Sequence, residues 1–129
     1  MKDLRKKIDI TVEITSTGYS AFANDLPVYT TGKTMEDVKN NLTDALNLYY
    51  DDLGYRVSHD NLKISIDLQQ FFKYYKVLNA QFLAQMIGMN ATLLSQYVRG
   101  RKKPSTRQTQ KIMKGIHKIG KELSDIELL

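Results

Sequence analysis

The chain has 129 residues, of which 42% are hydrophobic and 26% charged, and it contains no Cys. This composition is that of a globular chain, and the length allows one domain or two very small ones. The lack of Cys excludes disulfides, thiolate zinc sites and cysteine nucleophiles. The sequence contains neither a signal-peptide apolar core nor an apolar run of roughly 18 residues, so we expect a cytoplasmic protein without membrane segments.

Charge is divided unevenly along the chain. Residues 1–67 carry 8 Lys and Arg against 11 Asp and Glu, a net charge of −3, whereas residues 68–129 carry 11 against 3, a net charge of +8. Such a division predicts two modules with different partners. The basic module suits a polyanion, and the acidic module does not.

The acidic module begins with strand patterns. Every second residue from Ile8 to Ile14 is apolar, which predicts a strand with one face against a core. Residues 16–18 read as a turn and residues 19–23 as a returning strand, and residues 28–31 can form a short third strand.

A helical period follows these strands. Thr34 is placed to cap a helix whose first turn is acidic, and Gly54 is placed to end it. The predicted apolar stripe consists of Val38, Leu42, Ala45, Leu46, Tyr49 and Leu53. Alternation at Leu62, Ile64 and Ile66 predicts a last strand, so residues 1–67 are expected to form a β-β-β-α-β module.

The basic module, residues 68–129, contains the pattern of a helix-turn-helix between Ala80 and Arg99. Ala84 is the small residue that a tight helix crossing needs, and Gly88 suits a turn with positive φ. Asn79 and Asn90 can cap the two helices, and Gly100 can end the second. The predicted core positions are Leu83, Ile87, Met89, Leu94 and Tyr97.

Two further helices are expected around this pair. The earlier one, about residues 68–75, carries Leu68, Phe71, Phe72 and Tyr75. The later one opens with a capping box of Ser105 and Gln108. Its apolar face is predicted to contain Ile112, Ile116, Ile119 and Leu123. The fold class is therefore α+β, a β-rich module followed by an all-α helix-turn-helix bundle.

The second helix of the pair is the predicted recognition helix. It is expected to expose Ala91, Thr92, Leu93, Ser95, Gln96 and Arg99. In the major groove, Gln96 can contact adenine with two hydrogen bonds, and the methyl groups of Thr92 or Ala91 can touch thymine. The cations expected near phosphates are Arg99, Arg101, Lys102, Lys103 and Arg107. A plain helical bundle with a basic surface explains the apolar stripes equally well. It does not explain why the small residue, the turn glycine, the two caps and the core positions all occur at the spacing of a helix-turn-helix.

Residues 82–105 resemble the Xre/Cro-type helix-turn-helix of phage repressors. The resemblance implies base reading at Ala91, Thr92, Leu93 and Gln96, and phosphate contacts near Asn79 and Gln81. Ala91 departs from the polar residue usual at its position, which reduces its expected role to a methyl contact.

The acidic module resembles the HicB antitoxin domain at GYSAFANDLP (residues 18–27) and TGKTMEDV (residues 31–38). It departs from that family at Val28 and Tyr29, where a Gly-Cys pair is often found. The resemblance implies a truncated RNase H-like fold that precedes a DNA-binding domain. It also implies binding of HicA, a small basic toxin that cleaves mRNA, which an acidic module suits.

Catalysis is not expected. A two-metal nuclease needs convergent carboxylates, for which Asp9, Glu13, Asp25 and Asp52 are available. However, Asp9 and Glu13 point away from the predicted core face, and the resemblance implies a truncated fold that lacks the nuclease's catalytic set. His59 and His117 lie in different modules and suit surface positions. No cofactor or metal ion is predicted.

The sequence thus predicts an antitoxin that represses its own operon by binding operator DNA as a homodimer or higher oligomer. One alternative is a stand-alone regulator whose first module only oligomerises. Another is a protein-interaction module whose helical half has lost DNA binding. The dimer surface stays open between the C-terminal apolar run, residues 119–129, and a sheet edge of the first module.

Overall fold

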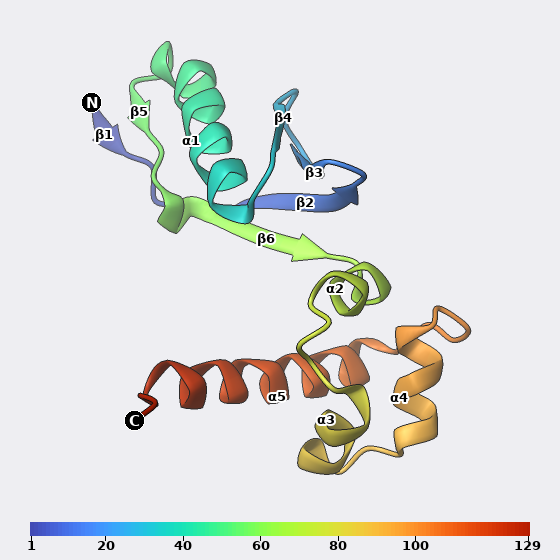
Figure 1. The fold of residues 1–129 in the computed structure, drawn as a ribbon. Helices are drawn as coiled ribbons and strands as arrows, with labels where there is room; N and C mark the ends of the chain where they lie inside the picture. The colour runs from blue at the N-terminus through green and yellow to red at the C-terminus, as the bar shows by residue number, and fades with distance from the viewer. The chain divides into compact units, whose positions relative to one another are not determined.

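The computed structural model describes residues 1–129, and the chain divides into two compact units, Met1–Gln70 and Phe71–Leu129. The architecture is α+β: the first unit holds a mixed sheet and one long helix, and the second is built from helices (Figure 1). Because residues 68–70 are uncharged, the two units keep the net charges of −3 and +8. None of the helices combines the length and apolar character needed to cross a membrane.

The N-terminal unit is organised around a four-stranded sheet with the order β4-β3-β2-β6. Strands β2 (Ile8–Thr15) and β3 (Gly18–Ala23) form an antiparallel hairpin, and β4 (Tyr29–Gly32) adds to it. Strand β6 (Leu62–Ile66) lies parallel to β2 on the other side. All four predicted strands are confirmed, although the third begins one residue later than expected.

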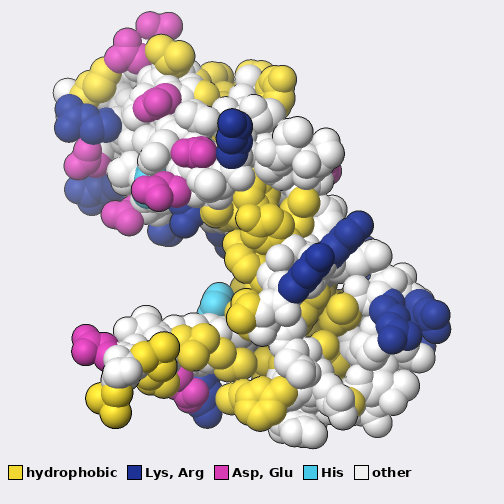
Figure 2. All heavy atoms as spheres, in the orientation of Figure 1, with side chains coloured by type: hydrophobic (Ala, Val, Ile, Leu, Met, Phe, Trp, Pro, Cys, Tyr) yellow, Lys and Arg dark blue, Asp and Glu magenta, His cyan; other side chains and the backbone are white.

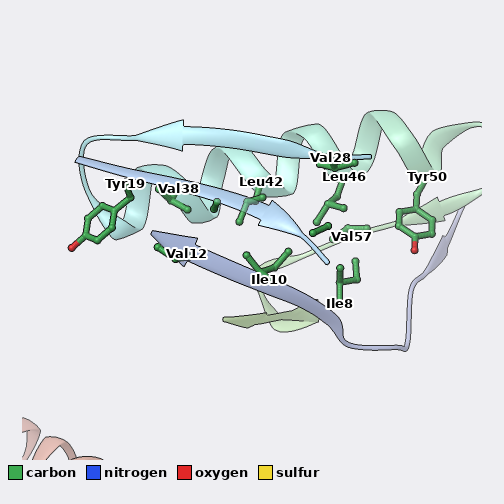
Figure 3. Packing of buried hydrophobic residues seen from close by; sticks show 12 residues of the cluster. Ile8, Ile10, Val12, Tyr19, Val28, Val38, Leu42, Leu46, Tyr50 and Val57 are labelled. Atoms are coloured by element: carbon green, nitrogen blue, oxygen red, sulfur yellow. The ribbon is translucent and has the colours of Figure 1, made fainter. Parts of the chain in front are cut away.

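One face of this sheet packs against helix α1 (Met35–Asp51). Ile10 lies opposite Ala23 on β3 and Ile64 on β6, so the pairing register directs alternate apolar residues to the same face. Figure 3 shows Ile10 and Val12 of β2 and Leu42 of α1 pointing toward one another. Asp9 and Glu13 are exposed, in agreement with their predicted orientation away from the core. The buried core is Ile8, Ile10, Val12, Tyr19, Ala21, Ala23, Val28, Val38, Leu42, Leu46, Tyr50 and Val57.

Helix α1 begins as predicted, because the Thr34 hydroxyl accepts a hydrogen bond of 3.1 Å from the Asp37 amide. The last part of its predicted apolar stripe is wrong. Tyr49 and Leu53 are 39% and 59% exposed, whereas Tyr50 is buried at 5%. Tyr50 packs edge-on against Tyr55, with ring centroids 6.5 Å apart.

The partner of Tyr50 belongs to a second sheet that the sequence pattern does not reveal. Strands β1 (Lys2–Asp3) and β5 (Tyr55–Arg56) form a parallel pair, and α1 contacts β5. Strands of two residues are too short to show a period. Beyond them, the short 3-10 helix η1 (His59–Asn61) leads into β6.

The C-terminal unit contains α3 (Ala80–Ile87), α4 (Ala91–Val98) and α5 (Thr106–Ser124), while α2 (Leu68–Tyr74) spans the boundary between the units. All four expected helices are present. Helix α5 packs against α3. Leu123, predicted on the apolar face of α5, is 62% exposed. Since α5 has 19 residues and α3 only 8, the last turns of α5 extend past α3. The buried hydrophobic residues of this unit are Phe72, Leu83, Ala84, Met89, Leu94, Tyr97 and Ile112.

Candidate nucleic-acid interface

Helices α3 and α4 are joined by a three-residue turn, Gly88 to Asn90. Gly88 has φ 68° and ψ 32°, the left-handed conformation that costs other residues roughly 1–2 kcal/mol. The Met89 amide donates to the Ala84 carbonyl over 2.9 Å, which ties the turn to the end of α3. The predicted role of Gly88 is therefore confirmed.

The predicted caps are also present. The side-chain oxygen of Asn79 accepts from the Phe82 amide over 3.0 Å, and that of Asn90 accepts from the Leu93 amide over 3.1 Å. Ser105 accepts from the Gln108 amide over 3.2 Å, which is one of the two bonds of the predicted capping box.

The packing between the two helices matches the predicted core positions. Ala84 and Leu94 are completely buried, and Leu83, Met89 and Tyr97 are nearly so. Ile87 is half-buried. A small residue at Ala84 lets the helices approach closely, and this approach sets the angle at which α4 presents its outer face.

That outer face of α4 and the start of α3 enclose an open hollow of about 420 Å³. Thr92, Ser95 and Gln96 contribute polar groups from α4, and Gln81 contributes an amide from α3. Arg99 and Arg101 add positive charge at the same hollow. Seven of the predicted site residues are brought together here: Gln81, Ala91, Thr92, Ser95, Gln96, Arg99 and Arg101.

The loop after α4 is fastened to the helix that precedes it. The Gln96 carbonyl accepts from the amides of Arg101, over 2.9 Å, and Lys102, over 3.3 Å. Gly100 has φ 74°, which allows the chain to turn back in this way. The exposed cations of the loop are thus held beside the end of α4, where Figure 2 shows dark-blue side chains.

Five predicted site residues lie outside this hollow. Asn79 uses its side-chain oxygen as a cap. Leu93, Ser95 and Gln96 are all predicted to be exposed, but each is half-buried, and of the three only Leu93 does not line the hollow. Lys102 and Lys103 are exposed on the loop. Arg107 lies in the first turn of α5 and lines a second hollow, of about 470 Å³, with Gln108, Gln110, Lys111 and Lys114.

The two lysines of this second hollow are not among the predicted site residues. Their spacing from Arg107 is the signal that could have found them, because residues four and seven positions apart share a helix face. The exposed acidic side chains visible in Figure 2 gather over the N-terminal unit and at the C-terminal end of the chain. From Phe71 to Lys121 there are 11 Lys and Arg and no Asp or Glu.

Comparison with known proteins assigns no family. No protein-family model matches the chain, and no significant match was found among curated proteins or solved structures. No group of three or more His, Asp or Glu side chains is arranged to hold a metal ion.

Proposed function

We propose that the C-terminal unit is a helix-turn-helix that binds duplex DNA through α4. The observation that carries this proposal is the hollow in which polar side chains of α3 and α4 meet two arginines. A helix that exposes short polar side chains beside flanking cations suits the major groove, where side chains read base edges and cations contact phosphates.

Within this arrangement the residues of α4 have different roles. Thr92 is exposed in the first turn of α4, and Gln96, which is half-buried, lies one turn later at the same hollow. Gln96 can form two hydrogen bonds with adenine, and Thr92 can bind a base or a thymine methyl group. Arg99, Arg101 and the two loop lysines contact phosphates and fix the register.

The acidic N-terminal unit is proposed to bind a basic protein. Its charge of −3 disfavours nucleic acid and favours a cationic partner. The order of strands and helix and the HicB-like segments at residues 18–27 and 31–38 support a HicB-type antitoxin, whose partner is a small basic toxin. In this proposal the chain neutralises the toxin and represses its own operon.

The DNA-binding proposal is tested by measuring affinity for the DNA upstream of the gene across a range of salt concentrations. Each phosphate contact is expected to add about 0.9 to the slope of log affinity against log salt. Gln96→Ala is expected to reduce discrimination at one base pair by about 1–3 kcal/mol. Lys102→Ala, the matched control, is expected to weaken all sequences alike. A flat salt response of the unaltered chain would refute DNA binding.

The antitoxin proposal is tested by co-expression with the neighbouring reading frame. A short frame that encodes a basic protein is expected to co-purify with this chain and to be toxic without it. If no such partner exists, the stand-alone regulator is the better interpretation, with the N-terminal unit serving only to oligomerise.

A dimer is expected because one such helix contacts only a few base pairs. Two copies over a palindrome would place their α4 helices about 34 Å apart, one turn of DNA. Light scattering combined with size-exclusion chromatography measures the oligomeric state, and a monomer at micromolar concentration would argue against this arrangement.

A further inference from the structure

Five cations of α5 recur at intervals of three or four residues. They form what we call the basic stripe: Arg107, Lys111, Lys114, Lys118 and Lys121. This spacing places them on one face of the helix. The buried residues Ile112 and Gly115 lie on another face, toward α3, so the stripe is free of the core and all five side chains are exposed.

The first part of the stripe is a shaped surface. Arg107, Lys111 and Lys114 line a hollow with the side chains of Gln108 and Gln110. Every lining residue is either a cation or an amide, and none is apolar. Protein interfaces usually contain an apolar centre and are poor in Lys, so this composition favours a phosphate ligand over a protein surface.

The stripe contacts the turn between α3 and α4 but does not line the hollow on α4. The Lys111 ammonium group donates to the Gly88 carbonyl over 3.4 Å, in the turn between α3 and α4. The hollow on α4 and the hollow on α5 share no lining residue. The phosphates that the stripe contacts are therefore different from those next to the bases that α4 reads.

We infer that the basic stripe of α5 is a second DNA-backbone site, which binds phosphates flanking the segment that α4 reads. This inference rests on the proposed DNA-binding function and extends it. The stripe runs over 15 residues, from Arg107 to Lys121, and the 14 rises of about 1.5 Å between them make about 21 Å, which corresponds to roughly six base pairs along a duplex. Glu122 follows Lys118 by one turn, so the far end of the stripe contributes less than Lys111 and Lys114.

The test compares two triple variants of the full chain. The stripe variant is Lys111→Gln, Lys114→Gln, Lys118→Gln, and the control is Lys33→Gln, Lys39→Gln, Lys63→Gln in the N-terminal unit, which removes the same charge. Lys and Gln have similar helix propensities, so α5 is preserved. The probes are a duplex of the DNA upstream of the gene and a random-sequence duplex of equal length.

The stripe variant is expected to lower the salt slope by about 2–3, because each phosphate that is no longer neutralised removes roughly 0.9, while the control leaves the slope unchanged. When the upstream duplex is lengthened by about six base pairs, the unaltered chain is expected to bind more tightly. The affinity of the stripe variant is expected to stay the same. Discrimination between upstream and random sequence is expected to be equal in both, because the stripe touches no bases.

An unchanged salt slope in the stripe variant, with binding by the unaltered chain intact, would overturn this inference alone. A loss of self-association with an unchanged slope would do the same and would assign the stripe to a protein interface. If the unaltered chain binds neither duplex, the proposed function and this inference fall together. Lys114→Gln by itself is expected to lower the slope of log affinity against log salt by about 0.9. This single variant tests the inference if the triple variant does not fold.

Discussion

Gly115 is a residue of α5 that packs closely against side chains of α3. A Cβ atom built on Gly115 would clash with Cγ2 of Ile87 and would lie 3.3 Å from Cδ1 of Leu83. Gly120, in the same helix, has open space at the same position. Both glycines lower the helix propensity of α5, but only at Gly115 does packing against α3 leave no room for a side chain. Substitutions at the two positions therefore distinguish the effect of helix propensity from the effect of packing.

Gly115→Ala is expected to lower the free energy of unfolding by about 1–2 kcal/mol, because overpacking outweighs the helix-propensity gain. Gly120→Ala is expected to raise it by up to about 1 kcal/mol. Urea denaturation followed by circular dichroism measures both. Stabilisation of similar size at the two positions would show that α3 and α5 do not approach closely at Gly115.

At the scale of elements, asparagine side chains bind the backbone of segments that lie outside the strands. Asn61, buried at the end of η1, donates to the carbonyls of Leu4 and Lys6 over 2.7 and 2.9 Å and accepts from the Ser58 amide over 2.9 Å. Asn47 on α1 similarly donates to the Val57 carbonyl and accepts from its amide. These amides connect the N-terminal segment and the approach to β6 with the rest of the unit.

Asn61→Ala is expected to lower the free energy of unfolding by about 2–3 kcal/mol, since it leaves two carbonyls and one amide without a partner. Asn41→Ala is the matched control, because Asn41 makes a single exposed bond to the Thr31 carbonyl and its loss should cost only about 0.5–1 kcal/mol. Thermal and urea unfolding of the two variants are compared. A smaller destabilisation at Asn61 than at Asn41 would contradict the structural role assigned to the buried amide.

At the scale of the whole molecule, each unit has its own buried residues. The N-terminal core is built from β2, β3, α1 and neighbouring segments, and the buried residues of the C-terminal unit come from its own helices and the turn between α3 and α4. The opposite net charges reinforce this division, because they suit the units to different partners.

Destabilisation is therefore expected to stay within the unit in which it is introduced. Asn61→Ala should increase amide hydrogen exchange in residues 1–70, and Gly115→Ala should increase it in residues 71–129, because cooperative opening follows contiguous packed regions. Mass spectrometry of proteolysed samples maps the change. Increased exchange throughout the chain in either variant would show that the two units unfold together.

Features that depend on neighbouring residues could be predicted from the amino-acid sequence. The apolar alternation of β2, the caps at Thr34, Asn79 and Asn90, and the turn at Gly88 are local signals, and each is found in the structure. The charge division is a sum over residues and needs no fold. Most of the predicted DNA-binding set could be chosen from the sequence because it lies on one helix and the loop that follows.

Features that depend on what lies opposite in space required the tertiary structure. Tyr50 rather than Tyr49 is buried because β5 runs beside α1, and the β1–β5 pair joins residues far apart in the chain. From the sequence alone Gly115 only lowers helix propensity, and the structure shows that it also makes room for the side chains of α3. The hollow on α5 likewise follows from a helix face that packing against α3 leaves exposed. Local preference selects the elements, and long-range contacts select the faces they bury and expose.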